Sequence, residues 1–330
     1  MRLVSGIKPT GGLTLGNYIG AIKQFVNLQN TLKDTEFFIF IADLHAITTP
    51  IKREELKKNI KDIAALYLAC GLDPNQVNLF VQSDIPAHSQ LAYVMESTVY
   101  MGEIERMTQF KDKRQKQEES LRSSLFTYPA LMAADILLYD ADIVPVGEDQ
   151  TQHLELTRTL AQRFNHLYGE TFVVPKAYHP KTGARIKSLT EPTKKMAKTD
   201  ESPKSYILLL DDIAQAKNKI RSAVTDSEAS IYYDPENKPG ISNLLTIYAS
   251  LENVSIEDAV LKFKDSSYKD FKEAVAVSVE NTLKPIQDNY ARIMSEGILH
   301  DVLDQGQSVA SKIAYKKISK VYKKIGFQRK

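Results

Sequence analysis

The chain opens with MRLVSGIKPTGGLTLGNYIGAIKQFVNLQNTL, residues 1–32, and the order of its parts points to one class of fold. Met1 to Ser5 is short and apolar, as a buried strand is, and Asn17 to Leu32 carries apolar residues at helical spacing. Glycines and a proline fill the turn between them: Gly6, Pro9, Gly11, Gly12 and Gly16. Backbone N–H groups at such a turn, with the positive end of a helix dipole, predict a phosphate site. Glycines that only make room for packing would give the same pattern.

Strand-like and helix-like segments alternate after this opening. Four further segments are typical of strands, the last more weakly: 36–42, 77–81, 142–146 and 172–174. Helical spacing covers two segments between them, 53–69 and 150–167. Strands alternating with helices predict an α/β fold with a doubly wound, Rossmann-like parallel sheet, which we expect to form a catalytic domain over residues 1–204.

Helices dominate beyond Pro203. Five segments have helical spacing: 211–223, 243–250, 255–263, 271–295 and 308–325. They predict a smaller helical C-terminal domain over residues 205–330, with the last helix packed back on the first domain. Residues 301–330 hold eight basic and two acidic residues, and we expect five lysines there mostly to face water: Lys316, Lys317, Lys320, Lys323 and Lys324. This face is either a solvated surface or a contact for a phosphate backbone.

Composition and charge exclude several classes of protein. With 43% hydrophobic and 25% charged residues, the chain is neither disordered nor of low complexity. A net charge of +2 means that a polyanion must meet a local basic patch. Cys70 is the single cysteine and the histidines lack metal-ligand spacing, so no disulfide or protein metal site is expected; His88 and His153 are expected in surface or core positions. No signal peptide or membrane-length apolar run is present, so we expect a cytoplasmic protein.

Two short motifs, far apart in the chain, resemble the signatures of class I aminoacyl-tRNA synthetases. Thr14-Leu15-Gly16-Asn17 lies where that family carries His-Ile-Gly-His. Lys195-Met196-Ala197-Lys198-Thr199 resembles its Lys-Met-Ser-Lys-Ser loop and falls in the stretch 183–204, whose composition predicts a mobile surface loop. Such side chains can hydrogen-bond an ATP phosphate and neutralise a leaving pyrophosphate. Ala197 departs from the family pattern because it lacks a hydroxyl group.

Longer strings extend the resemblance over essentially the whole chain, to the tryptophanyl-tRNA synthetases of bacteria. They are DLHAIT at 43–48, MTQFK at 107–111, LMAADILLY at 131–139, PVGEDQ at 145–150, AVTDS at 223–227 and PGISNLL at 239–245. The resemblance implies activation of L-tryptophan with ATP to tryptophanyl-AMP and pyrophosphate, then transfer to the 3′-terminal adenosine of tRNA(Trp). It also implies Mg²⁺ carried by ATP, anticodon-side contacts from the helical domain, and a homodimer.

The same resemblance implies the site residues. For catalysis they are Thr14, Asn17, Lys113, Lys195 and Lys198. For ATP they are Lys8, Pro9, Thr10, Gly16, Asn17, Gly147, Glu148, Asp149, Ile186, Lys195, Met196, Ala197, Lys198 and Thr199. For L-tryptophan they are Gly6, His45, Gln109, Tyr128, Met132, Asp135, Val144, Val146 and Gln150. Two residues depart from the family pattern: Lys8 stands where Gln is common, and Val4 where Phe is common. Asp149 would equally serve as a helix N-cap.

Asp135 is the residue expected to recognise the amino acid. It lies in an apolar helical segment, where an unpaired carboxylate would cost several kcal/mol, on the order of the penalty for breaking a buried ion pair. From spacing alone, an arginine such as Arg106 or a helix cap would satisfy it. The resemblance implies instead that Asp135 accepts the indole N–H, a bond worth roughly 1.5–3 kcal/mol that rejects phenylalanine.

Three other functions stay open at this point. Tyrosyl-tRNA synthetases share the fold, and phenol, like indole, offers a donor to a carboxylate. The strings at 132–135 and 147–150, and the lack of an extra C-terminal RNA-binding module, favour tryptophan. A non-catalytic paralogue that binds tryptophan or tRNA would have lost signature residues, and Ala197 is the single candidate. A nucleotidyltransferase acting on a small acid would lack the basic helical C-terminal half.

Overall fold

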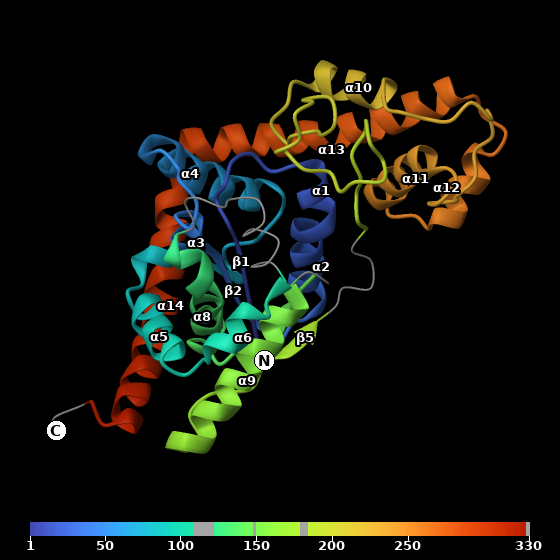
Figure 1. Ribbon diagram of the computed structural model, residues 1–330. Helices are drawn as coiled ribbons and strands as arrows, with labels where there is room; N and C mark the ends of the chain where they lie inside the picture. Colours follow the sequence, from blue (N-terminus) through green and yellow to red (C-terminus); the bar gives the residue numbers. More distant parts are fainter. Residues whose placement is uncertain (109–121, 148–149, 179–183, 328–330) are drawn as a thin grey trace.

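One sheet of five parallel strands forms the centre of the molecule (Figure 1), in a computed structural model that describes residues 1–108, 122–147, 150–178 and 184–327. The strand order is β3-β2-β1-β4-β5. The strands are β1 Arg2–Ile7, β2 Glu36–Ile41, β3 Val77–Val81, β4 Ile143–Pro145 and β5 Lys176–Tyr178. The order reverses between β1 and β4, which is the doubly wound, Rossmann-type arrangement. The predicted fold class is confirmed.

The fifth strand is not where the sequence predicted it. Residues 172–174 form no strand, because the side chain of Asn165 pairs with the backbone there: its Oδ1 accepts from Phe172 N at 2.9 Å and its Nδ2 donates to Phe172 O at 2.8 Å. The Phe172 ring instead packs edge-on against Phe164, with centroids 4.9 Å apart. Strand pairing starts only at Lys176, which is in register with Ile143.

Helices cover both faces of the sheet because side chains alternate along each strand. Leu3, Phe37 and Ile39 point into a core with α1 Leu15–Asn17, the π-helical turn η1 Tyr18–Ile22, α2 Lys23–Thr31 and α4 Arg53–Ala69. Phe38 and Phe40 point into a second core with α5 Ala87–Glu96, α8 Ser123–Leu137 and α9 Thr151–Tyr168. Three short helices complete this part: α3 Asp43–Ala46, η2 Gln82–Asp84 and α6 Met101–Glu105. The single helix expected over 17–32 is thus divided by a π-helical turn.

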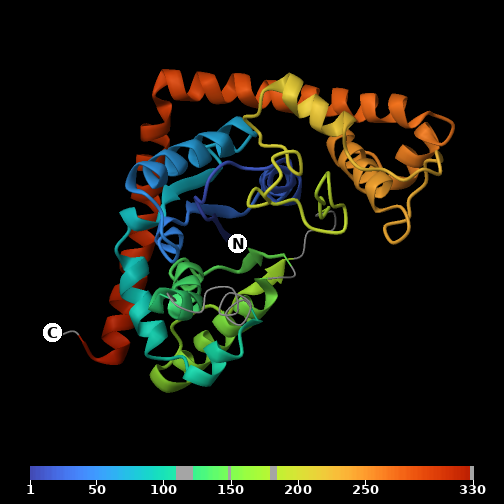
Figure 2. The same ribbon diagram turned by 45° about the horizontal axis from the view of Figure 1, so that its top comes forward.

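A helical lobe follows the sheet and leads back to it (Figure 2). It comprises α10 Ile213–Arg221, α11 Pro239–Glu252, α12 Ile256–Phe263 and α13 Tyr268–Glu296. The long α13 reaches α4, where the Tyr290 hydroxyl donates to Asp62 Oδ1 at 2.8 Å. The chain then turns at Gly297, with φ of 73°, and α14 Ile298–Ile325 lies along β3 and α5, so the last helix packs on the sheet domain.

Close approach between α14 and β3 requires a glycine. A Cβ added at Gly306 would lie 2.0 Å from the carbonyl oxygen of Leu79, so this helix passes directly over the edge strand. The same packing corrects one prediction. Lys317 does not face water: it is 7% exposed, donates to Thr171 O at 2.9 Å and pairs with Asp140.

The stretch before the helical lobe is only partly a surface loop. Ile186, Ser188, Leu189 and Met196 are buried, although the composition predicted a surface segment. Further on, residues 207–209 pair with the glycine-rich turn: Leu15 N donates to Ile207 O at 2.8 Å and Leu209 N to Leu13 O at 2.9 Å. The chain just beyond residue 204 therefore packs with the sheet domain, and a division of domains at that residue stays a prediction.

No helix among the described residues is long and apolar enough to cross a membrane.

Candidate active site

The site is assembled at the carboxyl edge of the sheet, where β1 and β4 end and the strand order reverses. Ligands bind at this edge in doubly wound folds. The predicted residues fall into two groups there. One surrounds the buried carboxylate of Asp135, and the other joins the glycine-rich turn to the lysine-bearing segment 195–199.

Asp135 accepts hydrogen bonds from three side chains. Its Oδ1 lies 2.6 Å from Gln82 Nε2 and 2.7 Å from His88 Nδ1, and its Oδ2 lies 2.8 Å from His45 Nε2. The alternatives left open by the sequence, an arginine partner or a cap, are not used. Burial raises the pKa of Asp135, but the bonds from His45 and His88 outweigh burial and lower it to about 2. The carboxylate is thus ionised and can only accept.

The loops that follow β2 and β3 hold these donors in place. Gln82, directly after β3, accepts from Leu44 N at 3.2 Å through Oε1, so its amide group is oriented with Nε2 toward Asp135. Asp43, the first residue of α3, accepts from Leu44 N and Ser83 N at 3.0 Å each and connects α3 to η2. His45 follows on α3, which places its ring over Asp135.

Tyr128 and His153 form the opposite side of this group. The Tyr128 ring meets His45 edge-on, with centroids 6.3 Å apart, and its hydroxyl lies 2.6 Å from His153 Nε2. Burial raises the pKa of Tyr128, so it stays a phenol and can donate. Val144 and Val146 are buried at the end of β4, and Met132 packs beside them against the same core. Gln150 is the N-cap residue of α9.

Gly6 is required by packing at the end of β1. A Cβ there would lie 2.6 Å from the Phe40 ring. That ring in turn lies 5.8 Å from His88, centroid to centroid. The glycine thus allows an aromatic wall to form behind the Asp135 group. Its contact with tryptophan stays a prediction.

The first signature caps its own helix. Asn17 Oδ1 accepts from Thr14 N and Thr14 Oγ1, both at 2.9 Å, and Asn17 N donates back to Thr14 Oγ1 at 3.1 Å. This capping box fixes both side chains at the N-terminus of α1. Because Asn17 Oδ1 is taken, the amide NH₂ group is left as the donor for a ligand. The geometry explains why Thr and Asn occur together at this spacing.

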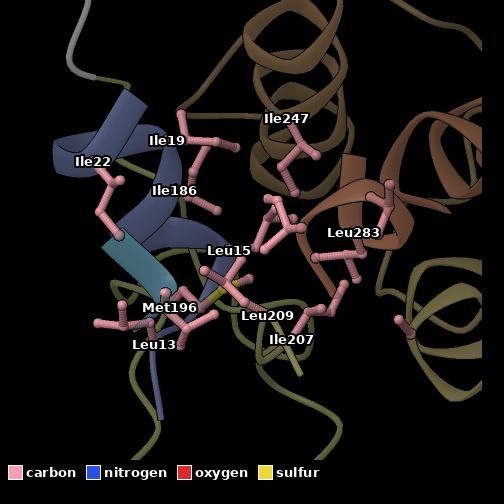
Figure 3. Close-up of a cluster of buried hydrophobic side chains, with 14 of the residues drawn as sticks. Leu13, Leu15, Ile19, Ile22, Ile186, Met196, Ile207, Leu209, Ile247 and Leu283 are labelled. Carbon is pink, nitrogen blue, oxygen red and sulfur yellow. The ribbon is translucent and has the colours of Figure 1, made fainter. Parts of the chain in front are cut away.

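The second signature packs directly on the first. A Cβ at Gly16 would lie 3.5 Å from Ile186 Cβ and 3.6 Å from Met196 Cβ. Ile186 O also accepts from Met196 N at 3.0 Å. Figure 3 shows Leu15, Ile186 and Met196 in one apolar cluster with Ile207 and Leu209. The two motifs, which the sequence separates widely, therefore share a core.

Lys198 lies against the glycine-rich turn. Gly11 has φ of +107°, and a Cβ there would lie 2.2 Å from Lys198 Nζ. Burial lowers the pKa of Lys198, and the charge of Glu55 acts in the opposite direction with a smaller effect. Lys195 and Thr199 are exposed, and Ala197 is partly exposed, with its carbonyl accepting from Asp200 N at 3.2 Å.

The remaining predicted ATP residues lie along the same turn. Lys8 Nζ donates to Thr48 Oγ1 at 3.0 Å, Thr10 N donates to Lys8 O, and Pro9 O accepts from Asn59 Nδ2 at 3.4 Å. Gly147 is exposed just after β4 and accepts from Gln150 N at 3.0 Å. Four predicted residues lie outside the described part of the chain: Gln109, Lys113, Glu148 and Asp149.

Comparison with known proteins identifies the family. A family model for class I tRNA synthetases (W and Y) matches residues 1–284. The tryptophan–tRNA ligase of Oceanobacillus iheyensis is 54% identical, with 99% of each chain covered. That of Bacillus subtilis is 53% identical, with 99% of this chain and 98% of the relative covered. The chain belongs to the tryptophan–tRNA ligase family.

Solved structures agree with this membership in class I of the aminoacyl-tRNA synthetases. The tryptophanyl-tRNA synthetase of Mycoplasma pneumoniae has a TM-score of 0.89 at 38% identity, with 98% of this chain and 97% of that chain covered. The enzyme of Campylobacter jejuni, solved with ADP and tryptophan, has a TM-score of 0.83 at 35% identity, with 99% and 100% covered. A tyrosyl enzyme of Archaeoglobus fulgidus, at 20% identity, shares the fold.

Sequence reasoning missed Gln82, His88, Tyr139 and His153 as members of the site. His88 and His153 were expected in surface or core positions, and both are indeed buried, but they hydrogen-bond to Asp135 and Tyr128. Gln82 could have been found from the sequence, because it directly follows the predicted strand 77–81 and ligand-binding residues often lie at the carboxyl ends of parallel strands. No periodicity signals His88, which reaches Asp135 from another helix.

Proposed function

We propose that this chain activates L-tryptophan with ATP and then transfers the tryptophanyl group to the 3′-terminal adenosine of tRNA(Trp). One observation carries the amino-acid specificity. An ionised carboxylate offers about four acceptor positions, and the three side chains around Asp135 use two on Oδ1 and one on Oδ2. One position on Oδ2 is left, on the oxygen that also accepts from His45, and it suits the N–H of an indole.

In the first step, the carboxylate of tryptophan attacks the α-phosphorus of ATP. A bond forms between a carboxylate oxygen and phosphorus, and the bond to the bridging oxygen breaks, so that pyrophosphate leaves. No side chain has to act as a nucleophile. The Asn17 amide and the N–H groups at the start of α1 would bind phosphate oxygens as charge develops, and Lys195 and Lys198 would neutralise the pyrophosphate.

The position of Lys198 supports its proposed role in binding the pyrophosphate, because its side chain lies against the glycine-rich turn at Gly11. In our proposal, ATP phosphates enter between the turn and the lysine, and Lys195 closes over them from the surface. Mg²⁺ would accompany ATP as a counterion on the phosphate oxygens, as is usual for nucleotide substrates. We propose that ATP is also contacted by nine surrounding residues: Lys8, Pro9, Thr10, Gly16, Gly147, Ile186, Met196, Ala197 and Thr199. The walls of the tryptophan pocket are proposed to be Gly6, Met132, Val144, Val146 and Gln150.

Four residues beyond the described part stay predictions: Gln109 for tryptophan, Glu148 and Asp149 for ATP, and Lys113 for the pyrophosphate. The helical lobe is proposed to contact the anticodon side of the tRNA. A homodimer, with tRNA spanning two subunits, is proposed from the family, and sedimentation equilibrium of the purified chain would test it.

The decisive experiment is amino-acid-dependent exchange of pyrophosphate into ATP. We expect exchange with L-tryptophan and none above background with L-tyrosine or L-phenylalanine. Exchange with tyrosine would assign the chain to the sister activity. A lack of exchange with all three, in a protein that is folded by circular dichroism, would contradict the catalytic proposal, and restoring the hydroxyl with Ala197→Ser would then show whether Ala197 is the cause.

A further inference from the structure

We propose that His88, held by Tyr139, is a positioning residue that fixes the orientation of the Asp135 carboxylate toward the amino-acid pocket. This inference rests on the proposed tryptophan activation and adds two buried residues to it. Neither side chain was expected to act in the site.

His88 connects two buried groups through its two ring nitrogens. Its Nδ1 lies 2.7 Å from Asp135 Oδ1, and its Nε2 lies 2.7 Å from the Tyr139 hydroxyl. The His88 and Tyr139 side chains are both fully buried, and Asp135 is 1% exposed. Water therefore cannot replace either contact, and the ring has one orientation that satisfies both neighbours.

The protonation states follow from the partners. Asp135 is ionised, because its pKa is about 2, so the Nδ1 atom of His88 must carry the hydrogen. Burial raises the pKa of Tyr139 well above its usual range, so this residue stays a phenol and can donate. With a hydrogen on Nδ1, the other ring nitrogen, Nε2, is placed to accept from the Tyr139 hydroxyl. The polar atoms that join Tyr139, His88 and Asp135 are then all paired, with each hydrogen bond donated toward Asp135.

Aromatic rings from the sheet pack against His88 and Tyr139 and hold them in place. Tyr139 stacks on Phe38, with centroids 5.1 Å apart and planes 16° apart. Phe40 and Phe80 lie 5.8 and 6.2 Å from the His88 ring, centroid to centroid. The histidine cannot swing away without displacing rings that are themselves packed on β2 and β3.

The consequence lies at the other end of the carboxylate. With Gln82 and His88 both on Oδ1, that oxygen has no acceptor position left for a substrate. The two oxygens are chemically equivalent, so the donors fix the plane of the carboxylate: a partial rotation about the Cβ–Cγ bond would lengthen both bonds. The pair of donors thus keeps the other oxygen, with its remaining acceptor position, toward His45 and the pocket. His88 acts only through Asp135, so it is a positioning residue.

Two amide substitutions separate this role from simple packing. In His88→Asn, the side-chain NH₂ group can occupy the place of Nδ1, so the donor to Asp135 is kept and the contact to Tyr139 is lost. In His88→Gln, the amide extends toward Tyr139 and the donor to Asp135 is lost. The two variants differ by one methylene group and remove the same ring.

The measurement is pyrophosphate exchange with wild type and both variants, varying L-tryptophan and ATP in turn. We expect His88→Gln to raise KM for tryptophan by about tenfold or more, because a charge-assisted bond is lost, while KM for ATP changes less than about twofold. His88→Asn is expected to stay within about threefold of wild type for both substrates.

A substrate analogue that lacks the indole N–H supplies a second readout. The analogue with sulfur in place of the ring N–H cannot donate to Asp135. We expect wild type and His88→Asn to prefer tryptophan over it strongly, and His88→Gln to lose at least about tenfold of that preference. Loss of packing alone would not change this ratio.

The outcomes separate the two proposals. If wild type shows no exchange with tryptophan, the proposed function fails. If wild type is active but the two amide variants have the same KM and the same preference, the positioning role is wrong. Should either variant fail to fold, Tyr139→Phe decides. It keeps the ring in place but removes the hydroxyl that Nε2 accepts from, so the tautomer with the hydrogen on Nδ1 is no longer fixed, whereas the amide of His88→Asn needs no such partner. We expect a KM for tryptophan raised severalfold with an unchanged KM for ATP, and an unchanged KM for both would overturn the inference.

Discussion

Asp135 makes the free energy of unfolding depend on pH in the acid range. Its pKa in the folded state is about 2, below the value of about 3.9 for an unfolded chain. A carboxyl group with a lowered pKa stabilises the fold fully above the unfolded value, and this stability is lost as the pH falls from about 4 to about 2. The difference corresponds to about 2–3 kcal/mol at neutral pH.

We therefore expect Asp135→Asn to lower the free energy of unfolding at pH 7 by about that amount. Between pH 4 and pH 2, its stability should fall less steeply than that of wild type. Urea denaturation at a series of pH values measures both effects, with the exposed Asp34→Asn as the control. Parallel pH curves for Asp135→Asn and wild type would contradict the predicted role of the buried carboxylate.

Gly11 tests the phosphate-binding turn. Its φ of +107° strains any other residue, and an added Cβ would lie 2.2 Å from Lys198 Nζ, which would have to move. We expect Gly11→Ala to cost about 1 kcal/mol of stability and to raise KM for ATP at least about tenfold, with KM for tryptophan nearly unchanged. Gly12→Ala is the matched control: its φ is ordinary and its Cβ would lie 3.3 Å from a Leu208 methyl group. Equal kinetic effects of the two would show that Lys198 is not held by the turn.

At the scale of elements, local periodicity located most helices and strands but not all their contacts. The segment 53–69 was predicted with its full length and is α4. Residues 172–174 have strand character, yet Asn165 takes the backbone groups that a strand would need. Helix α14 begins at Ile298 rather than at residue 308, and the part before residue 308 packs on β3 through Gly306.

The packing of α14 on β3 can be tested with two glycines. Alanine normally stabilises a helix by about 1 kcal/mol relative to glycine. At Gly306 the added methyl group would meet a backbone carbonyl at 2.0 Å, so we expect Gly306→Ala to destabilise the protein by about 1–3 kcal/mol. At Gly20 the nearest atom is 3.8 Å away, so Gly20→Ala should be neutral or stabilising. The urea midpoint of Gly306→Ala is expected to fall and that of Gly20→Ala to stay or rise, and an unchanged or raised midpoint for Gly306→Ala would be evidence against close contact.

At the scale of the whole molecule, Asn243 joins the helical lobe to the second signature. Its Oδ1 accepts from Lys187 N at 2.8 Å and its Nδ2 donates to Lys187 O at 3.0 Å. Lys187 in turn pairs with Lys195 as an isolated β-bridge. A cleft of about 990 Å³ lies between α2 and helices α11 and α12, and Asn243 lines it. The lobe therefore contacts the segment that carries Lys195 through the backbone of Lys187.

We expect Asn243→Ala to lower kcat for pyrophosphate exchange by about tenfold and to leave KM for tryptophan within about twofold. The reason is that both backbone groups of Lys187 lose their partner, at about 1–3 kcal/mol, and the lysine segment is held less firmly. Thr246→Ala, one turn along α11, removes only a bond to Ser242 O within the helix and serves as the control. A change confined to KM for tryptophan would instead link Asn243 to the amino-acid pocket.

The amino-acid sequence by itself determined the α/β class, four of the five strands, the helical C-terminal half and the two signatures, because apolar periodicity, glycine positions and short motifs are local properties. Only the tertiary structure decided which side chains meet. Gln82 and His88 reach Asp135 from the short helix η2 and from α5, both distant in sequence, and Lys317 is buried because α14 returns to the sheet. A buried carboxylate must be paired, but which donors pair with it depends on where strand ends and helices converge in space, and residue spacing along the chain carries no record of that convergence.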